Sequence, residues 1–221
     1  MHRRVPGLTA AANSPRRFDA TLAAAIRANL RAFGRAPSEA PATLRRAAVA
    51  VAVVRGNDGR ACFLLTRRAP SLTAHGGQWA LPGGRVDGAE TESEAALREL
   101  EEEVGLHVAG DSIIGVLDDY VTRSGYVITP VVVWCEDAGE IRPDPREVAA
   151  VHSVPLDELD RPEVPRVHRI EESDRPVLSI PLLGTYIHAP TAAVLYQFRE
   201  VAFHGRDTRV AHFEQPVFAW R

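Results

Sequence analysis

The stretch from Gly84 to Leu106, GRVDGAETESEAALRELEEEVGL, restricts the possible fold more than any other part of the chain. Thr91 followed three residues later by Glu94 is a capping-box start for a helix, and Gly105 suits the position just past the last turn. Aliphatic residues recur at helical spacing on one side of this segment, at Leu97, Leu100 and Val104. The sequence therefore predicts a short amphipathic helix whose apolar face packs on a sheet.

The acidic residues of this helix gather on a separate face. Glu99, Glu102 and Glu103 are spaced i, i+3 and i+4, so their side chains are neighbours. Their crowding is unfavourable, because the helix C-terminus already carries partial negative charge and only Arg98 offers a local counter-charge. Clustered carboxylates suit Mg²⁺ or Mn²⁺, which prefer oxygen ligands. A cation site and a solvated acidic face are the two interpretations of this pattern.

The spacing of the fixed residues in this stretch resembles the Nudix box. Gly84 is followed after five residues by Glu90, and after seven more by the run Arg98-Glu99-Leu100-Glu101-Glu102-Glu103-Val104-Gly105-Leu106. The run agrees with the family pattern at every constrained position, and so many matches rarely arise by chance. The resemblance implies an α/β fold, a Nudix-type α/β/α sandwich with a mixed central sheet, here carrying an N-terminal helix and a C-terminal extension.

The resemblance also implies roles for individual residues. Mg²⁺ or Mn²⁺ would be held beside a diphosphate by the Gly84 carbonyl and by the three catalytic glutamates Glu99, Glu102 and Glu103. Glu99 is also the candidate to orient or deprotonate the attacking water. Glu90 and Arg98 would pair and brace the loop against the helix, and Gly83 would let the backbone approach the ligand. A further base or metal ligand is expected downstream, with Glu147 as the candidate and Glu140 in reserve.

The segment before the box resembles the extra motif of the coenzyme A diphosphatase branch of the family. The matching positions are Leu64-Leu65-Thr66-x-Arg68-Ala69 and Gly77-x-x-x-Leu81-Pro82-Gly83-Gly84. Leu81 replaces a Phe of the motif, and Thr73 replaces an Arg. The second change matters more, because a guanidinium fork binds phosphate in a way that a hydroxyl does not. Arg67 or Arg85 would have to substitute for the missing Arg.

Substrate contacts are therefore expected from Arg67, Arg68 and Gly83. Arg123 matches a basic position of the same branch loosely, and a phosphate contact and a solvated loop residue are equally good interpretations of it. The implied reaction is Mg²⁺-dependent hydrolysis of coenzyme A or acyl-CoA to 3′,5′-ADP and the phosphopantetheine half. The alternatives are ADP-ribose, NADH or another nucleoside diphosphate derivative as substrate, or a nucleotide sensor that does not cleave. A sensor would predict degraded carboxylates, whereas all the catalytic acids are present.

Composition argues against several other functions. The net charge of −3 gives no electrostatic basis for binding nucleic acid or an anionic membrane, and all 26 basic residues are arginines, which excludes a catalytic lysine. Cys62 and Cys135 lie in apolar runs without a CxxC pattern, so we expect buried free thiols. No apolar run reaches transmembrane length. We expect a cytoplasmic enzyme whose partner is a small nucleotide.

The chain divides into three parts: a flexible lead and amphipathic helix at 1–41, a Nudix domain at 42–160, and an extension packed on the core at 161–221. In the first part, Leu22, Ile26, Leu30 and Phe33 predict a helix over Phe18–Phe33 that packs on the core, with a homodimer contact as the alternative. Gly56–Gly59 predicts a tight turn in a hairpin between the strands Ala47–Val54 and Ala61–Thr66.

Further elements are expected from pattern alone. In the domain these are strands at Asp111–Leu117, Gly125–Cys135 (central in the sheet) and Glu147–Val154, a polar loop at Asp118–Ser124, and a short helix at Pro155–Leu159. In the extension they are a charged loop at Arg161–Arg175, strands at Val177–Leu183 and Val210–Trp220, and a helix at Thr191–Phe203. Trp79 is expected to be a packing anchor, and His75, His188, His204 and His212 to be surface or capping residues.

Overall fold

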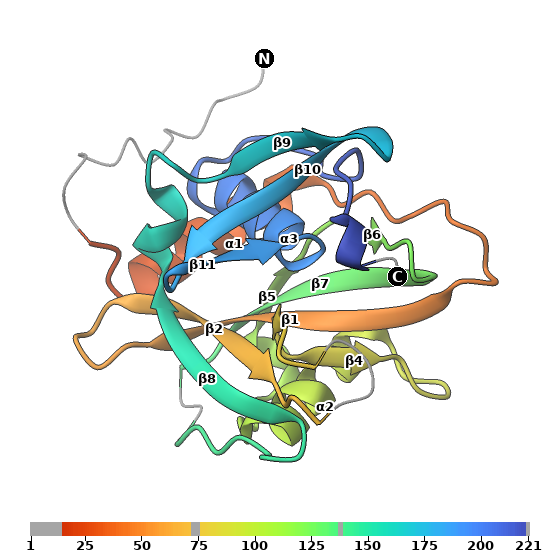
Figure 1. The fold of residues 1–221 in the computed structure, drawn as a ribbon. Coiled ribbons are helices and arrows are strands. Elements are labelled where there is room, and N and C mark those ends of the chain that lie inside the picture. Colours follow the sequence, from red (N-terminus) through yellow and green to blue (C-terminus); the bar gives the residue numbers. More distant parts are fainter. Residues whose placement is uncertain (1–14, 72–75, 137–138, 220–221) are drawn as a thin grey trace.

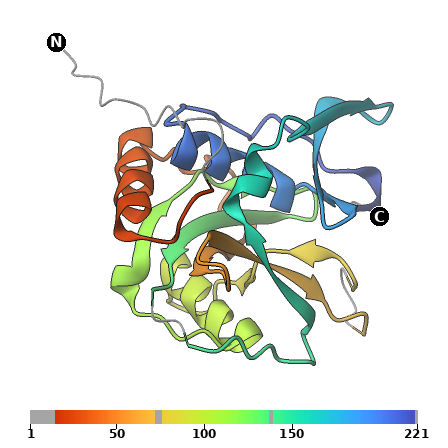
Figure 2. The same cartoon turned by 90° about the vertical axis from the view of Figure 1, so that its left-hand side faces the viewer.

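The computed structural model describes residues 15–71, 76–136 and 139–219. A mixed sheet forms the middle layer; helix α2 (Glu92–Val104) covers one face, and helices α1 (Ala20–Phe33) and α3 (Thr191–Phe198) lie on the other (Figures 1 and 2). Buried side chains form one hydrophobic core on each face. This arrangement confirms the predicted α/β/α sandwich. None of the described helices has the length and apolar character that a membrane span requires.

The sheet is built on strand β1 (Arg45–Arg55), which is buried almost throughout. It pairs antiparallel with β2 (Ala61–Arg68) across the predicted turn, and parallel with β7 (Tyr126–Trp134) on its other side. Both predictions, the hairpin and a central strand at β7, are therefore confirmed. The two cysteines, one in β2 and one just after β7, are free and buried, as expected.

Shorter strands and turns complete the sheet. They are β3 (Trp79–Ala80), β4 (Gly83–Arg85), β5 (Ile113–Val116), β6 (Tyr120–Val121) and β8 (Val148–Pro155), with short 3-10 helices at Gly110–Ser112 and Leu156–Asp160. The β4 segment pairs with β1, so the residues that precede α2 are anchored directly on the central strand. The second 3-10 helix is the short closing helix that the sequence predicted.

Helix α1 begins and ends as its sequence indicates. Asp19 accepts a hydrogen bond from the backbone N–H of Leu22, and Gly34 follows the last turn with a left-handed φ of 60°. Its buried side chains, Ile26, Leu30 and Phe33, pack into the core on the α3 side of the sheet. The packing role predicted for this helix is confirmed.

The extension differs from its prediction in two places. The expected charged loop at Arg161–Arg175 contains strand β9 (Arg166–Ile170) and the start of β10 (Ser173–Leu182). Strand β9 is an edge strand with four of its five residues exposed, so its charges are solvated and it lacks the apolar alternation that identifies a strand. Pro176 is tolerated in β10 because the pairing register shifts between Ser173 and Val177.

The last strand of the small sheet is β11 (Thr185–His188), joined to β10 by a two-residue turn in which Leu183 and Gly184 both have positive φ. The predicted strand at Val210–Trp220 is wrong, because this segment makes only an isolated bridge between Val177 and Glu214 and then a 3-10 helix at Val217–Ala219. The predicted helix is confirmed in extent, since α3 continues as a π-helix over Arg199–Phe203.

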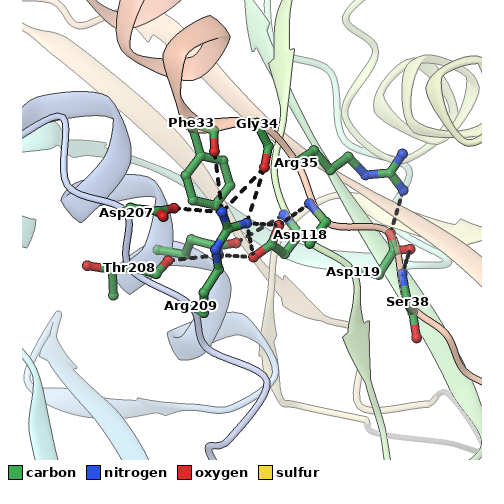
Figure 3. Close-up of polar contacts among 11 residues, drawn as sticks. Phe33, Gly34, Arg35, Ser38, Asp118, Asp119, Asp207, Thr208 and Arg209 are labelled. Atoms are coloured by element: carbon green, nitrogen blue, oxygen red, sulfur yellow. Dashed lines mark hydrogen bonds and ion pairs between the residues drawn. The ribbon is translucent and has the colours of Figure 1, made fainter. Parts of the chain in front are cut away.

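The polar loop predicted between β5 and β7 is only partly correct. It contains the two-residue strand β6, and Asp118, Asp119 and Thr122 are buried. Asp118 accepts hydrogen bonds from Arg209 and Gln197, and Asp119 accepts them from Arg35 (Figure 3). These carboxylates join the segment after α1 and the end of the extension to the sheet.

Candidate active site

The acidic helix α2 has the boundaries that its sequence predicts. Thr91 and Glu94 form the reciprocal capping box, and Gly105 adopts a left-handed φ of 75° at the other end. The aliphatic face packs on β1, with Leu100 and Val104 fully buried. The last turn contains no basic residue, so its carboxylates are not neutralised from within that turn.

Arg98 is the counter-charge for the acidic face of the helix. Its guanidinium forms a bidentate pair with Glu90, with distances of 2.8 and 3.1 Å, and donates to the backbone carbonyl of Arg85 at 2.9 Å. The same group contacts Glu99 and Glu102, each at 2.9 Å. These contacts hold the pKa of Arg98 above its usual range. Arg98 therefore ties the loop before the helix to two of its glutamates, in the geometry expected for a brace.

Glu103 is the most buried of the acids, with 3% of its side chain exposed. It accepts a hydrogen bond from the Gly83 N–H at 3.2 Å and lies 3.5 Å from the Arg68 guanidinium. Burial raises the pKa of Glu103 to about 7, against the opposing influence of those two neighbours. This carboxylate is thus desolvated without being fully compensated, which is the environment that a bound cation would stabilise.

Glu99 lies against the backbone of the Pro-Gly-Gly turn, with 14% of its side chain exposed. A Cβ added to Gly84 would overlap the Glu99 carboxylate, and one added to Gly83 would overlap the carbonyl of Ala48. Burial raises the pKa of Glu99, while Arg98 opposes the rise. The glycines therefore let the backbone of β4 approach both the central strand and the acid.

Glu102 and Glu147 are more exposed than these two acids. The Glu102 side chain is 57% exposed and contacts Arg98. Glu147 is exposed and immediately precedes β8, and its charge is among the smaller influences that raise the pKa values of Glu99 and Glu103. The reserve candidate, Glu140, instead pairs with Arg142 in an exposed loop.

The donor set of this site fits a hard divalent cation. Carboxylate oxygens and a backbone carbonyl are the ligands that Mg²⁺ and Mn²⁺ prefer. Over the described parts of the chain, no three acidic, histidine or cysteine side chains are already arranged to hold an ion. At this site one nitrogen of Arg98 contacts both Glu99 and Glu102, each at 2.9 Å.

A cavity of about 700 Å³ lies between the sheet and the C-terminal extension. None of the glutamates described above is among its lining residues, but Arg68 and Gly83, which contact Glu103, are. Arg68, Gly83, Gly84 and Arg85 line its acidic-helix side. Arg67 is not among the lining residues; it is exposed, and its Nε lies 3.4 Å from the Gly77 carbonyl. Of the arginines expected to bind substrate, Arg68 is therefore the one that contacts both the cavity and a buried glutamate.

Trp79 lines the same cavity and packs against the core, which confirms its role as a packing anchor. Arg123 lies on the turn between β6 and β7, where it pairs with the buried Glu214 at 2.5 Å, and it is not among the lining residues. This pair joins the sheet to the extension and satisfies the guanidinium within the protein. Thr73 and His75, which the sequence analysis singled out, lie outside the described residues.

Sequence reasoning missed the part of the cavity that the extension forms. Tyr186, His188 and Phe218 line it, together with Tyr126 of the sheet. Their only signal is that aromatic and histidine side chains occur near strand ends, which is too common to identify a site. These residues meet through the folding of the extension over the sheet rather than through any local pattern.

A family model described as "NUDIX domain" matches residues 44–178. "Nudix hydrolase 3" of Caenorhabditis elegans is 39% identical over 106 residues, covering 46% of this chain and 44% of that protein. "Uncharacterized Nudix hydrolase NudL" of Klebsiella pneumoniae is 41% identical over 132 residues, covering 57% of this chain and 65% of that protein. A solved "MutT/nudix family protein from Enterococcus faecalis" aligns over 74% of this chain and 65% of its own with 16% identity and a TM-score of 0.49. The chain thus spans less than two thirds of each of these relatives.

Proposed function

Since a family model matches more than half of its length, the chain belongs to the NUDIX family, and from that premise we propose that it hydrolyses the diphosphate of a nucleoside diphosphate derivative with Mg²⁺ or Mn²⁺. The observation that carries the proposal is the desolvated Glu103, which contacts the Gly83 N–H and Arg68, two residues that line the cavity. A carboxylate in such surroundings is costly unless a cation or a proton compensates it.

Three glutamates would hold the metal, Glu99, Glu102 and Glu103, with the Gly84 carbonyl as a further ligand. When bound, the ion neutralises diphosphate charge and lowers the pKa of a coordinated water. The close packing of Glu99 on Gly84 supports this assignment, because it brings a carboxylate to the backbone of the residue whose carbonyl would be the further ligand.

The residues of the chain supply the remaining chemistry. Glu99, positioned by Arg98, would orient the attacking water, and Glu147 would act as an extra base or ligand beside it. Arg68 would contact the diphosphate, because it lies between the cavity and Glu103. Arg67 and Arg123 are weaker candidates for substrate contacts, because neither lines the cavity and Arg123 is paired with Glu214.

Coenzyme A or an acyl-CoA is the substrate we favour, cleaved to 3′,5′-ADP and the corresponding phosphopantetheine. Support comes from the motif upstream of the box and from a cavity large enough for a ligand of that size. Thr73, which stands where that motif has an arginine, is the reason to keep ADP-ribose and NADH as the second candidates.

A chromatographic screen of the purified chain tests the proposal. Each of coenzyme A, an acyl-CoA, ADP-ribose and NADH is incubated with Mg²⁺, and a parallel set contains excess chelator. Chelator-sensitive release of 3′,5′-ADP from coenzyme A supports the favoured substrate. Turnover of ADP-ribose or NADH alone would promote the second candidates, and nucleotide binding without turnover of any substrate would favour the non-cleaving sensor.

A further inference from the structure

The cavity has a second wall that the family match does not include. His188 of β11, its neighbours Ile187 to Pro190, and Phe218 of the last 3-10 helix all line it, and all lie beyond residue 178. They face a cavity whose other lining includes Arg68 and Gly84 beside the acidic helix. A ligand whose diphosphate lies at the acidic end would therefore place another of its groups against the extension.

His188 carries an unsatisfied polar atom on that wall. Among the described residues, its Nδ1 is the single buried side-chain nitrogen or oxygen without a hydrogen-bond partner. Burial lowers the pKa of His188, so the ring is neutral near pH 7 and this nitrogen can donate or accept according to its tautomer. Buried polar atoms are nearly always paired in folded proteins, so we expect a bound ligand to supply the hydrogen-bond partner of this nitrogen.

Aromatic side chains line the cavity near His188. Phe218 packs edge-on against the His188 ring at 5.2 Å between centroids, yet 55% of the phenylalanine remains exposed. Tyr126 and Trp79 line the same cavity from the sheet. Aromatic faces beside an unpaired polar atom are complementary to a planar heteroaromatic ring that has hydrogen-bonding edges.

We propose that the C-terminal extension forms the nucleobase site of the enzyme, with Phe218 contacting the face of the base and His188 Nδ1 hydrogen-bonding its edge. The inference rests on the proposed function for the position of the diphosphate. A pantetheine arm could pair Nδ1 through one of its amides, but it has no planar ring to contact Phe218, Tyr126 and Trp79, which is why a base fits this wall better.

Binding measurements without turnover test this assignment. Calorimetry compares AMP, ribose 5-phosphate and 4′-phosphopantetheine in the presence of Mg²⁺. The wild-type chain is expected to bind AMP about tenfold more tightly than ribose 5-phosphate, since the base adds one hydrogen bond and one ring contact. His188→Leu should reduce AMP affinity to the level of ribose 5-phosphate, and Phe218→Ala should reduce it by a smaller factor.

Two further variants separate a binding role from a structural one. His188→Asn places an amide near the Nδ1 position and should retain most of the preference for AMP. His168→Leu is the matched control, because His168 lies on β9 and borders a separate hollow that His188 also lines. Thermal melting of each variant checks that it is folded, and the AMP preference of His168→Leu should equal that of the wild type.

Several outcomes would overturn the inference: no AMP preference in the wild type, an unchanged preference in His188→Leu, its loss in His168→Leu, or a loss of 4′-phosphopantetheine affinity in place of AMP affinity. The proposed function fails separately. A chain that cleaves no diphosphate but whose AMP preference depends on His188 retains the base site without the activity, and the reverse result retains the activity without the site.

Discussion

Two groups of buried carboxylates in this molecule have opposite surroundings. Asp118 and Asp119 receive hydrogen bonds from backbone N–H groups and from arginines supplied by both ends of the chain (Figure 3). Glu103 receives one backbone N–H and an arginine at 3.5 Å. Burial would raise the pKa of Asp119, but Ser38, Thr129 and Arg35 outweigh it and lower that pKa, whereas burial raises the pKa of Glu103 to about 7.

The difference separates carboxylates that hold the fold together from those that remain available to a ligand. A carboxylate whose lone pairs are already occupied gains little from a cation and loses much when its partners are removed. A desolvated carboxylate with few partners is stabilised strongly by a bound cation and loses little when those partners are removed, because its charge is otherwise uncompensated. The following variants test whether the two groups differ in this way.

The largest effect is expected at the acidic helix. Glu103→Gln should lower kcat/KM by at least about 10³-fold, equivalent to roughly 4 kcal/mol of transition-state stabilisation, because it removes a charge that would hold the cation. The free energy of unfolding of the metal-free protein at pH 7.5 should stay equal or rise, since a buried charge is replaced by a neutral amide of similar shape. Steady-state kinetics and urea unfolding measure the two quantities.

Glu102→Gln is the comparison for Glu103→Gln, because the Glu102 side chain is exposed. It should lose comparable activity with no measurable change in unfolding free energy. A Glu103→Gln protein that retains full turnover, or that unfolds much more easily than the wild type, would place Glu103 with the structural carboxylates.

Asp118→Asn should have the largest effect on stability. The amide presents a donor to one of two groups, the Ala36 N–H or the Gln197 side-chain N–H, and its neutral charge leaves Arg209 without its buried partner. We therefore expect a loss of about 3 kcal/mol in unfolding free energy. The exposed Asp111→Asn is the control and should change stability by less than about 0.5 kcal/mol. Urea denaturation measures both, and equal midpoints for the two variants would show that the network contributes nothing.

Local signals account for what the sequence predicted well. The Thr91–Glu94 capping box, Gly105 and the Gly56–Gly59 turn each act within a few residues, so helix α2 and the first hairpin could be placed from pattern alone. The fixed spacing of the box likewise indicated which acids lie on one face of α2. None of these features depends on a distant part of the chain.

The remaining features depend on residues far apart in sequence. Arg123 pairs with Glu214, and Asp118 with Arg209, each across 91 positions, so neither charge could be assigned a partner from the sequence. The predicted loop over β9 was wrong because an exposed edge strand carries charges on both faces. The cavity wall at His188 was missed for the same physical reason as the ion pairs, since it forms only when the extension packs over the sheet.

The unfolding free energy should change with pH in opposite directions for carboxylates with raised and with lowered pKa values, so a pH series distinguishes the two groups. The folded pKa of Glu103 lies near 7, above its ordinary value of 4.5, so the protonated form is favoured in the folded state. Its contribution to stability is complete below about pH 4.5 and is lost as the pH rises through 7. In the metal-free protein the wild type should therefore lose roughly 2–3 kcal/mol relative to Glu103→Gln between pH 4.5 and 8.

Urea unfolding at each pH, with chelator present, measures this difference. Adding Mg²⁺ at pH 8 should restore the wild type but not the variant, because the ion binds the ionised carboxylate of the folded state. Parallel stability curves for the two proteins across this range would contradict the desolvated state assigned to Glu103.

Arg123→Gln should have the smallest effect on stability among these variants. It extends the comparison to a further buried carboxylate, that of Glu214, which pairs with Arg123. Only 2% of the Glu214 side chain is exposed; burial would raise its pKa, but Arg123, the Gln215 N–H and Ser173 lower it to about 2. Removing the guanidinium should lower the melting temperature at pH 7 only slightly, since Arg123 is half exposed and two other donors to Glu214 remain. The penalty should shrink below pH 4, where Glu214 of the variant becomes protonated. If thermal melting shows no loss while KM for the diphosphate substrate rises tenfold, Arg123 belongs to the substrate site and not to the group of structural carboxylate pairs.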